Sequence, residues 1–137
     1  MNVEFLATVA VIAPDPTDSR NLYVETLGLP LQGEDGGYYH TEQIAGCKSF
    51  GIWPLSQAAQ ACFETDHWPV ERPVPQVSIE FDVANAATVV PAARELEQAG
   101  SALLHGAREE PWGQTIARLQ SPEGGIIGIS YTPTLHD

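Results

Sequence analysis

The sequence contains few of the residues that mark disulfide-rich or nucleic-acid-binding proteins. Its two cysteines, Cys47 and Cys62, form no CxxC pair, so we predict no disulfide framework and expect reduced thiols in a cytoplasm. Only 6 Lys and Arg stand against 18 Asp and Glu, which gives a net charge of -12. Phosphate backbones and anionic membranes would be repelled, so neither nucleic acid nor a membrane is an expected partner.

Long apolar runs and common catalytic motifs are also missing. The apolar run from Phe5 to Ala13 is too short to span a bilayer and follows Glu4 rather than basic residues, so it predicts a first strand. The sequence has no Gly-x-Ser-x-Gly elbow and no histidine pair at HxH or HxxxH spacing. With 137 residues, 43% hydrophobic and 18% charged, one globular domain over residues 1–137 is expected.

The first half of the chain predicts a strand, a helix and three further extended segments. Asp15 and Pro16 are a suitable N-cap and first helical residue, and Gly28 is suited to end the helix. Residues 55–63 carry apolar side chains at helical spacing, and Ser56 is a plausible cap for that helix. The extended segments predicted around these two helices are 5–12, 29–32, 38–44 and 47–53.

The second half repeats this order after a stiff, proline-rich connection. Residues 77–83 alternate between apolar and polar, as in a strand, and a helix with Pro91 in its first turn ends at Gly100. Residues 101–105 are then expected to be extended. The strands 115–120 and 126–131 follow, and the segment from Ser121 to Gly124 forms the tight turn between them.

The two halves also correspond in short segments. Leu27-Gly28-Leu29 matches Ala99-Gly100-Ser101, and Phe50-Gly51-Ile52-Trp53 matches Ile127-Gly128-Ile129-Ser130. Together with the closing hairpin, this layout resembles the vicinal oxygen chelate superfamily, which includes glyoxalase I, bleomycin-resistance proteins and extradiol dioxygenases. The resemblance implies an α+β fold of two βαβββ modules, about 1–67 and 76–137, with a linker of about 68–75. These modules would form curved mixed sheets with helices on the convex side and a small-molecule site on the concave side.

Metal-dependent members of that superfamily take His, Glu or Gln ligands from the first and last strands of each module. By the resemblance, these positions fall on Thr8, Gly51, Ser78 and Gly128. None of the four offers a usual ligand for a divalent ion, so no metal cofactor is expected. Glu80 shares a strand face with Ser78, and a shift of one pleat would bring its carboxylate into the site.

Strand parity predicts which other residues line the concave face. Leu6, Thr8 and Ala10 would point inward from the first module, and Ser78, Glu80 and Asp82 from the second. The glycines would leave open space, while Trp53 and Trp112 would supply flat apolar walls, although Trp53 equally fits the edge of the core. The candidate ligand-binding residues are Thr8, Gly51, Trp53, Ser78, Glu80, Trp112, Gly128 and Ser130.

Three further expectations concern the charged residues near this face. Glu80 on an inner strand face needs a partner or a function, because a buried carboxylate is costly, and Arg108 or Arg118 is its natural ion-pair partner. Glu109 and Glu110 are expected to be a solvated pair in a loop. Glu80 is also the candidate catalytic residue, as a general base.

Two hypotheses for the function follow. The first is a small-molecule-binding protein resembling bleomycin-resistance proteins, which sequesters an aromatic or cationic compound without a metal, for example in antibiotic resistance. The alternative is a glyoxalase-like lyase or isomerase, or a dioxygenase, which uses a divalent metal or Glu80 as general base. A homodimer is expected in either case, and the identity of the ligand stays open.

Overall fold

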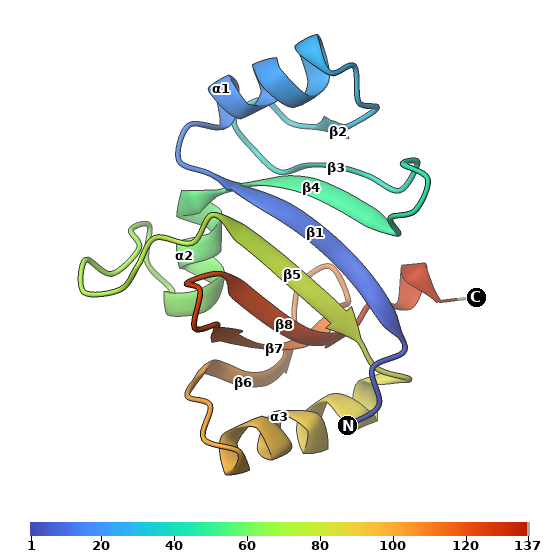
Figure 1. Ribbon diagram of the computed structural model, residues 1–137, viewed down its shortest axis with the longest axis vertical. Coiled ribbons are helices and arrows are strands. Elements are labelled where there is room, and N and C mark those ends of the chain that lie inside the picture. Colours follow the sequence, from blue (N-terminus) through green and yellow to red (C-terminus); the bar gives the residue numbers. More distant parts are fainter. Residues whose placement is uncertain (137) are drawn as a thin grey trace.

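Eight strands form one mixed sheet in the computed structural model, which describes residues 1–136 of the chain (Figure 1). The strand order is β2-β3-β4-β1-β5-β8-β7-β6. Read outward from the centre, the half β1-β4-β3-β2 repeats as β5-β8-β7-β6. The predicted α+β fold with two βαβββ units is therefore confirmed. The two units join within one chain, through the antiparallel pairing of β1 with β5.

The first unit follows the predicted order closely. Asp15 caps its helix by accepting hydrogen bonds from the backbone N–H groups of Thr17 and Asp18, and Gly28 after the helix has a φ of +70°. The strand predicted over 38–44 is shorter, because the Thr41 hydroxyl accepts a hydrogen bond from Gln43 N and turns the chain away. The elements are β1 (Phe5–Ala13), α1 (Pro16–Arg20), the π-helical turn η1 (Asn21–Thr26), β2 (Gln32–Gly33), β3 (Tyr39–Thr41) and β4 (Ser49–Pro54).

The second unit matches the sequence expectations at its closing hairpin and departs from them at β6. The strands β7 and β8 have the predicted bounds, and the turn between them closes with a hydrogen bond from Gly124 N to Ser121 O. The extended segment expected over 101–105 is instead the strand β6, which starts at Leu103 and ends at Glu109. The elements are β5 (Val77–Asp82), the 3₁₀ turn η2 (Ala86–Thr88), α3 (Val89–Gln98), β6 (Leu103–Glu109), β7 (Thr115–Gln120), β8 (Ile126–Tyr131) and the 3₁₀ turn η3 (Pro133–Leu135).

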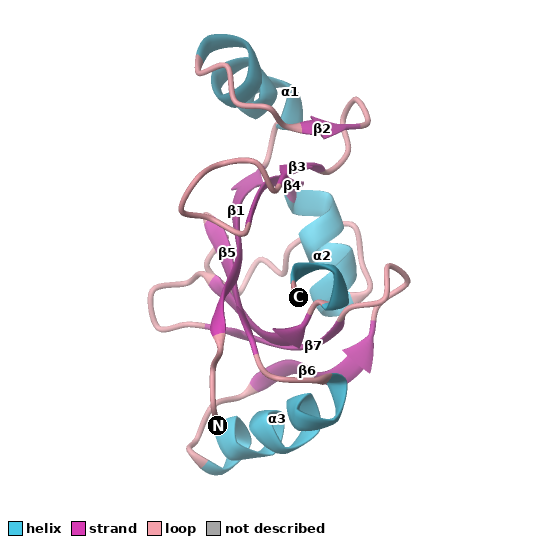
Figure 2. Cartoon of the chain, turned by 90° about the vertical axis from the view of Figure 1, so that its right-hand side faces the viewer, coloured by secondary structure: helices cyan, strands magenta, loops and turns pink. Residues whose placement is uncertain are grey.

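The helices α1 and α3 cover the outer, convex side of the sheet, as expected. Figure 2 shows α1 above and α3 below the curved sheet. Val89, Ala92 and Ala93 of α3 pack on Ala117 and Ile129 in one buried cluster. A second cluster places Tyr23 and Val24 of η1 against Ile52, together with Ala13 and Leu31. Both clusters use the strand residues whose side chains point away from the concave face.

The helix α2 (Leu55–Phe63) lies on the concave side, in contrast to the expectation that the helices are convex (Figure 2). Its Ala58, Ala59 and Cys62 pack against Ile12 of β1 and Ile126 of β8. Ser56 is not its cap, because the chain enters the helix directly from β4 with Pro54 at the N-cap position. The helix closes one end of the concave face and leaves the other part open.

A β-bulge in β1 changes which residues face inward. The register shifts between Leu6, which pairs with Phe81, and Thr8, which pairs with Glu80. Phe81 packs in the convex cluster under α3, and Leu6 is exposed rather than inside the concave face. Strand parity alone therefore placed Leu6 on the wrong side. No helix in residues 1–136 combines the length and the apolar character needed to cross a membrane.

Candidate functional site

The open part of the concave face forms a cavity of about 460 Å³. It is bounded by β1 and β5 in the middle, β3 and β4 on one side, and β7 on the other. Four of the predicted ligand-binding residues, Thr8, Trp53, Glu80 and Trp112, lie on its wall. The complete lining is Thr8, Ala10, Tyr38, His40, Glu42, Ser49, Trp53, Gln57, Glu80, Trp112, Gln114, Arg118 and Thr134.

Thr8 and Glu80 occupy the centre of this wall. They pair directly across the antiparallel strands β1 and β5, so both side chains stand on the same face. Residues 8 and 80 are also as far apart in the sequence as Gly28 and Gly100, the matching ends of the two helices. The internal repeat therefore makes Glu80 the counterpart of Thr8, one pleat away from Ser78, and brings a carboxylate into the site.

Gln114 holds Glu80 in position through its amide group. The Nε2–H of Gln114 donates to Oε1 of Glu80 at 2.7 Å and to Oγ1 of Thr132 at 3.1 Å. Its Oε1 accepts from the indole N–H of Trp112 at 2.9 Å. Because an indole nitrogen can only donate, this contact fixes which end of the amide faces Glu80. The loop tryptophan and the central carboxylate are thus linked through one buried side chain.

The environment of Glu80 favours its protonated form. Burial raises the pKa of this carboxyl above its usual value of 4.5, and the nearby charge of Asp82 raises it further. The positive charge of Arg118 and the hydrogen bonds from Gln114 and Thr8 oppose this rise in the pKa. A carboxyl with a raised pKa in a cavity is a candidate proton donor or acceptor.

Arg118 lies in the cavity wall but does not form the expected ion pair with Glu80. Its partner is Glu110, whose Oε1 lies 3.4 Å from Nη1 of Arg118 and 2.6 Å from Nε of Arg108. Glu110 is therefore buried between two arginines rather than solvated, which corrects the expectation from the sequence. Arg108 also donates to the backbone carbonyl of Ala61 in α2 and so ties that helix to β6.

Aromatic side chains form the remaining walls. Trp53 packs against the α2 core and also lines the cavity, so both readings of this residue hold. The guanidinium of Arg118 stands 5.5 Å from the centre of its ring. Trp112 is 60% exposed in the loop before β7. Tyr38 and His40 stack with ring centres 5.3 Å apart and planes 15° from parallel.

Gly51 and Gly128 do not leave the open space that was expected of them. A Cβ at Gly51 would stand 2.6 Å from the hydroxyl oxygen of Tyr38, and one at Gly128 would stand 2.7 Å from Cδ1 of Ile116. Both spaces are already filled by neighbouring side chains. Burial and the charge of Glu80 raise the pKa of the Tyr38 phenol, so this ring stays neutral beside the carboxyl.

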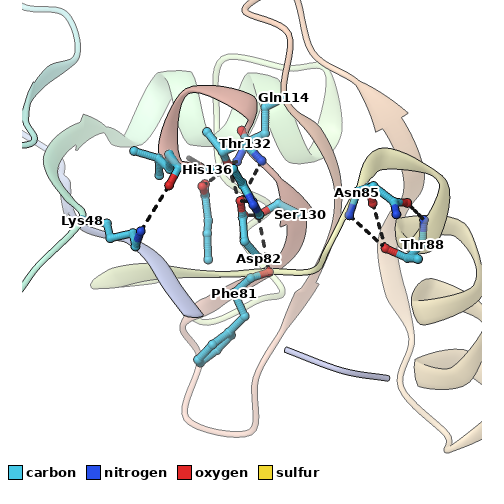
Figure 3. Close-up of polar contacts among 11 residues, drawn as sticks. Lys48, Phe81, Asp82, Asn85, Thr88, Gln114, Ser130, Thr132 and His136 are labelled. Carbon is cyan, nitrogen blue, oxygen red and sulfur yellow. Dashed lines mark hydrogen bonds and ion pairs between the residues drawn. The ribbon is translucent and has the colours of Figure 1, made fainter. Parts of the chain in front are cut away.

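Ser78 and Ser130 are buried and do not line the cavity either. The Ser78 hydroxyl has no hydrogen-bond partner among residues 1–136. Ser130 donates to Oδ1 of Asp82 at 2.6 Å (Figure 3). Asp82, which was expected to face the pocket, also accepts from the backbone N–H of Thr132 at 2.7 Å and contacts Nε2 of His136 at 2.9 Å. This fully buried carboxylate fastens the C-terminal segment over one end of the sheet instead of contacting a ligand.

The four superfamily metal positions do not fit a divalent ion. Thr8 and the two glycines offer no usual ligand, and only Glu80, which takes the place of Ser78 as the counterpart of Thr8, offers a carboxylate. Tyr38 fills the space at Gly51, and the Oε1 of Glu80 is engaged by Gln114. Within residues 1–136, no three side chains of His, Cys, Asp or Glu converge closely enough to hold a metal ion.

A second cleft lies outside the concave face, where β1 and β4 meet the start of α2. Its volume of about 620 Å³ is larger, and Pro14, Pro16 and Pro54 form part of its wall. Its charged or titratable residues, Asp66 and His67, are exposed. The concave cavity is the stronger candidate because it brings the buried Arg118 and the half-buried ionisable groups of Tyr38 and Glu80 together from different parts of the sheet.

Some wall residues were not predicted from the sequence. Gln114 lies just before β7, where strand parity could not be applied. Arg118 could have been oriented from the hairpin, because it pairs with the inward-facing Gly128. The other unpredicted wall residues, from β3 and its flanks, β4, α2 and the C-terminal turn, are Tyr38, His40, Glu42, Ser49, Gln57 and Thr134.

The arrangement of two βαβββ units around a concave cavity defines the fold of the vicinal oxygen chelate superfamily. No protein-family model matches the sequence, and no curated protein matches it. Solved structures do match. One is a glyoxalase/bleomycin resistance protein/dioxygenase superfamily member from Vibrio splendidus 12B01, with a TM-score of 0.57 and 15% identity over 93% of this chain and 100% of the other.

Two further matches are enzymes. The Mn(II)-bound glyoxalase from Novosphingobium aromaticivorans gives a TM-score of 0.58 at 14% identity, over 92% of this chain and 37% of the other. Methylmalonyl-CoA epimerase from Streptomyces coelicolor gives a TM-score of 0.57 at 12% identity, over 99% of both chains. At these identities the matches establish the shared fold alone, and the activity must be argued from the cavity.

Proposed function

We propose that this chain is a small-molecule-binding protein of the bleomycin-resistance kind, which sequesters an aromatic compound in its concave cavity without a metal. The cavity is the observation that carries the proposal. Its volume falls within the range of about 300–1,000 Å³ that is usual for ligand sites. Flat apolar walls surround a few fixed polar groups, which is the composition of an organic-ligand site.

The two cavity tryptophans provide the test. Trp53 and Trp112 lie on the wall, whereas Trp68 is buried elsewhere, with its indole N–H donating to Pro73 O. A thermal-shift screen of aromatic compounds and divalent metals comes first, because a ligand that binds only the folded state raises the melting temperature. Each hit is then titrated by tryptophan fluorescence in matched Trp53→Phe, Trp112→Phe and Trp68→Phe variants.

The results separate cavity binding from binding elsewhere. Binding in the cavity predicts that the ligand-dependent change is reduced in the Trp53 and Trp112 variants and kept in the Trp68 variant. Trp68 lines the second cleft, so loss of the signal in Trp68→Phe alone would move the site there. If metals and not aromatic compounds raise the melting temperature, the proposal is wrong.

A second candidate function is metal-independent proton transfer, as in an isomerase or lyase. The raised pKa of Glu80 favours it, because a general base works best when its pKa lies near the working pH. The test incubates the bound compounds in D₂O and follows exchange of their carbon-bound hydrogens by NMR. Exchange that disappears in Glu80→Gln, while the compound still binds, would establish catalysis; binding without exchange supports sequestration.

Two further expectations about the protein stay proposals. We propose a homodimer in the cytoplasm, in keeping with the two free thiols of Cys47 and Cys62. Sedimentation equilibrium of the reduced protein tests the dimer, since a single monomeric species over a range of concentrations would contradict it. Fractionation of the source cells tests the location.

A further inference from the structure

Arg118 places a buried positive charge in the wall of the concave cavity. Its side chain is 1% exposed and lines the cavity from β7, with its guanidinium 5.5 Å from the centre of the Trp53 ring. Of its donors, Nη1 contacts Nε2 of His105 at 3.0 Å and Oε1 of Glu110 at 3.4 Å. Its Nε has no hydrogen-bond partner among residues 1–136. A buried guanidinium with an unmatched N–H is costly unless something supplies an acceptor.

The neighbours of Arg118 neutralise its charge only in part. Nδ1 of His105 lies 2.7 Å from the backbone oxygen of Gly106, so Nδ1 carries the proton and Nε2 accepts from Arg118. Burial lowers the pKa of His105, which keeps this imidazole neutral. Glu110 shares one oxygen between Arg108 and Arg118, and its shorter contact is to Arg108. The cluster of two arginines, one glutamate and a neutral histidine therefore keeps one net positive charge.

The geometry points to an aromatic carboxylate as the ligand: its ring lies against Trp53 and Trp112, and its carboxylate accepts hydrogen bonds from the guanidinium of Arg118. This inference rests on the proposed function, since it names the class of ligand for the same cavity. A carboxylate matches the planar fork of a guanidinium and supplies the missing acceptor. A cationic ligand in the same place would be repelled by Arg118, and the two carboxyls on this wall are Glu80, which favours its protonated form, and Glu42, which is exposed.

The carboxyl of Glu80 faces the same space and decides how binding depends on pH. The charged or titratable groups around it are Arg118 from β7, Asp82 from β5 and the phenol of Tyr38 beside β4, and His40 of β3 and Glu42 line the same cavity. A bound carboxylate adds a second negative charge, so Glu80 takes up a proton when the ligand binds. Affinity for carboxylates therefore falls as the pH rises through the pKa of Glu80, and Glu80→Gln removes this fall.

The experiment uses the whole protein and matched sets of probes. Benzoate and 2-naphthoate are each compared with their carboxamide and with their aminomethyl analogue, by calorimetric titration. We expect each carboxylate to bind at least tenfold more tightly than its carboxamide and the aminomethyl compound to bind most weakly. The same titrations are repeated at several pH values on wild type and Glu80→Gln. The pH dependence of the affinity then reports the proton that Glu80 takes up on binding.

Two variants assign the preference to Arg118. In Arg118→Gln combined with Glu110→Gln, both members of the ion pair become neutral, the charge left without Glu110 is that of Arg108, whose side chain is 34% exposed, and the tenfold preference for carboxylates should disappear. Arg118→Lys keeps the charge and should keep part of the preference. Its melting curve and that of the double variant show that each is folded.

The outcomes separate this inference from the proposed function. If a carboxamide or aminomethyl compound binds as tightly as its carboxylate, or if the preference survives in the folded double variant, the inference is wrong while the binding function stands. If none of the six probes binds to the wild-type protein, the inference is wrong, and the thermal-shift screen of aromatic compounds decides separately whether the proposed function stands. A carboxylate preference that is lost with Arg118 supports both.

Discussion

The phenol ring of Tyr38 lies over the backbone of Gly51, where a side chain at position 51 would otherwise stand. A Cβ on Gly51 would meet Tyr38 Oη at 2.6 Å and Cε1 at 2.8 Å. The ring also stacks on His40 and lines the cavity. The glycine is therefore needed for the close approach of the ring rather than for an unusual backbone angle. One side chain from the segment before β3 thus fills the space beside β4 at position 51.

This relationship predicts a strong coupling between positions 38 and 51. Gly51→Ala should push the ring of Tyr38 aside and lower the free energy of unfolding by about 1–3 kcal/mol, the usual cost of overpacking. In a Tyr38→Ala background the same substitution should be nearly neutral. Urea unfolding of the two single variants and the double variant measures the coupling.

Gly106→Ala is the matched control, since a Cβ there meets no atom within 4 Å. It should change the free energy of unfolding very little. Equal effects of Gly51→Ala with and without Tyr38 would show that the ring does not occupy this space in solution.

The buried ion pairs of Glu110 predict that its removal lowers the free energy of unfolding far more than removal of the neighbouring Glu109. Glu110 has a side chain only 7% exposed beside an arginine that is 1% exposed, whereas Glu109 is exposed. Glu110→Ala leaves the charge of Arg118 without its carboxylate and should cost about 3–5 kcal/mol of unfolding free energy. Glu109→Ala should stay within about 0.5 kcal/mol. Chemical denaturation of both variants makes the comparison, and similar losses would contradict the buried pairing.

The fold was largely predictable because its signals are local. The alternation in residues 77–83, the turn from Ser121 to Gly124 and the cap at Asp15 each depend on neighbours in the sequence. The position of α2 depended on long-range packing instead. Its spacing predicted a helix but could not say that Ala58 and Cys62 pack on the concave side against Ile12 and Ile126.

The site was predicted less completely, for physical reasons visible at single residues. Thr8, Trp53 and Glu80 follow from strand parity, which is fixed by the pleat. The bulge at Ala7 reversed the parity of Leu6, and no pattern of spacing reports a bulge. The partnership of Glu110 with Arg108 and Arg118 arises across the β6–β7 hairpin and its loop, where charge type alone favoured a solvated position.

Trp112 is expected to separate binding from stability. Because it is 60% exposed, Trp112→Ala should change the free energy of unfolding by no more than about 0.5 kcal/mol. Loss of an aromatic anchor should weaken binding of the ligand by about 1–3 kcal/mol. Trp112→Phe keeps a flat ring but loses the N–H that donates to Gln114, so it tests the hydrogen bond separately.

Calorimetric titration with a compound from the aromatic screen measures the free energy of binding, and urea unfolding measures the free energy of unfolding. Binding by Trp112→Phe close to that of wild type would assign the effect to ring contact alone. Unfolding of Trp112→Ala under native conditions would instead place this tryptophan in the core.

The raised pKa of Glu80 predicts that its ionisation lowers the stability of the folded protein as the pH rises. Burial raises the pKa of its carboxyl in the folded state above the unfolded value of 4.5. As the pH rises past 4.5, the unfolded chain loses this proton first, so ionisation favours unfolding until the folded carboxyl has also lost its proton. Glu80→Gln keeps the shape and removes this penalty, so the variant should gain stability over wild type as the pH rises through that window, and the gain should then level off.

Urea unfolding of both proteins from pH 4 to pH 9 measures the difference, and the exposed Glu71→Gln serves as the control, for which the difference should not vary with pH. A gain that is constant across the range, or that shrinks as the pH rises, would mean that Glu80 is solvated and that the cavity does not favour its protonated form.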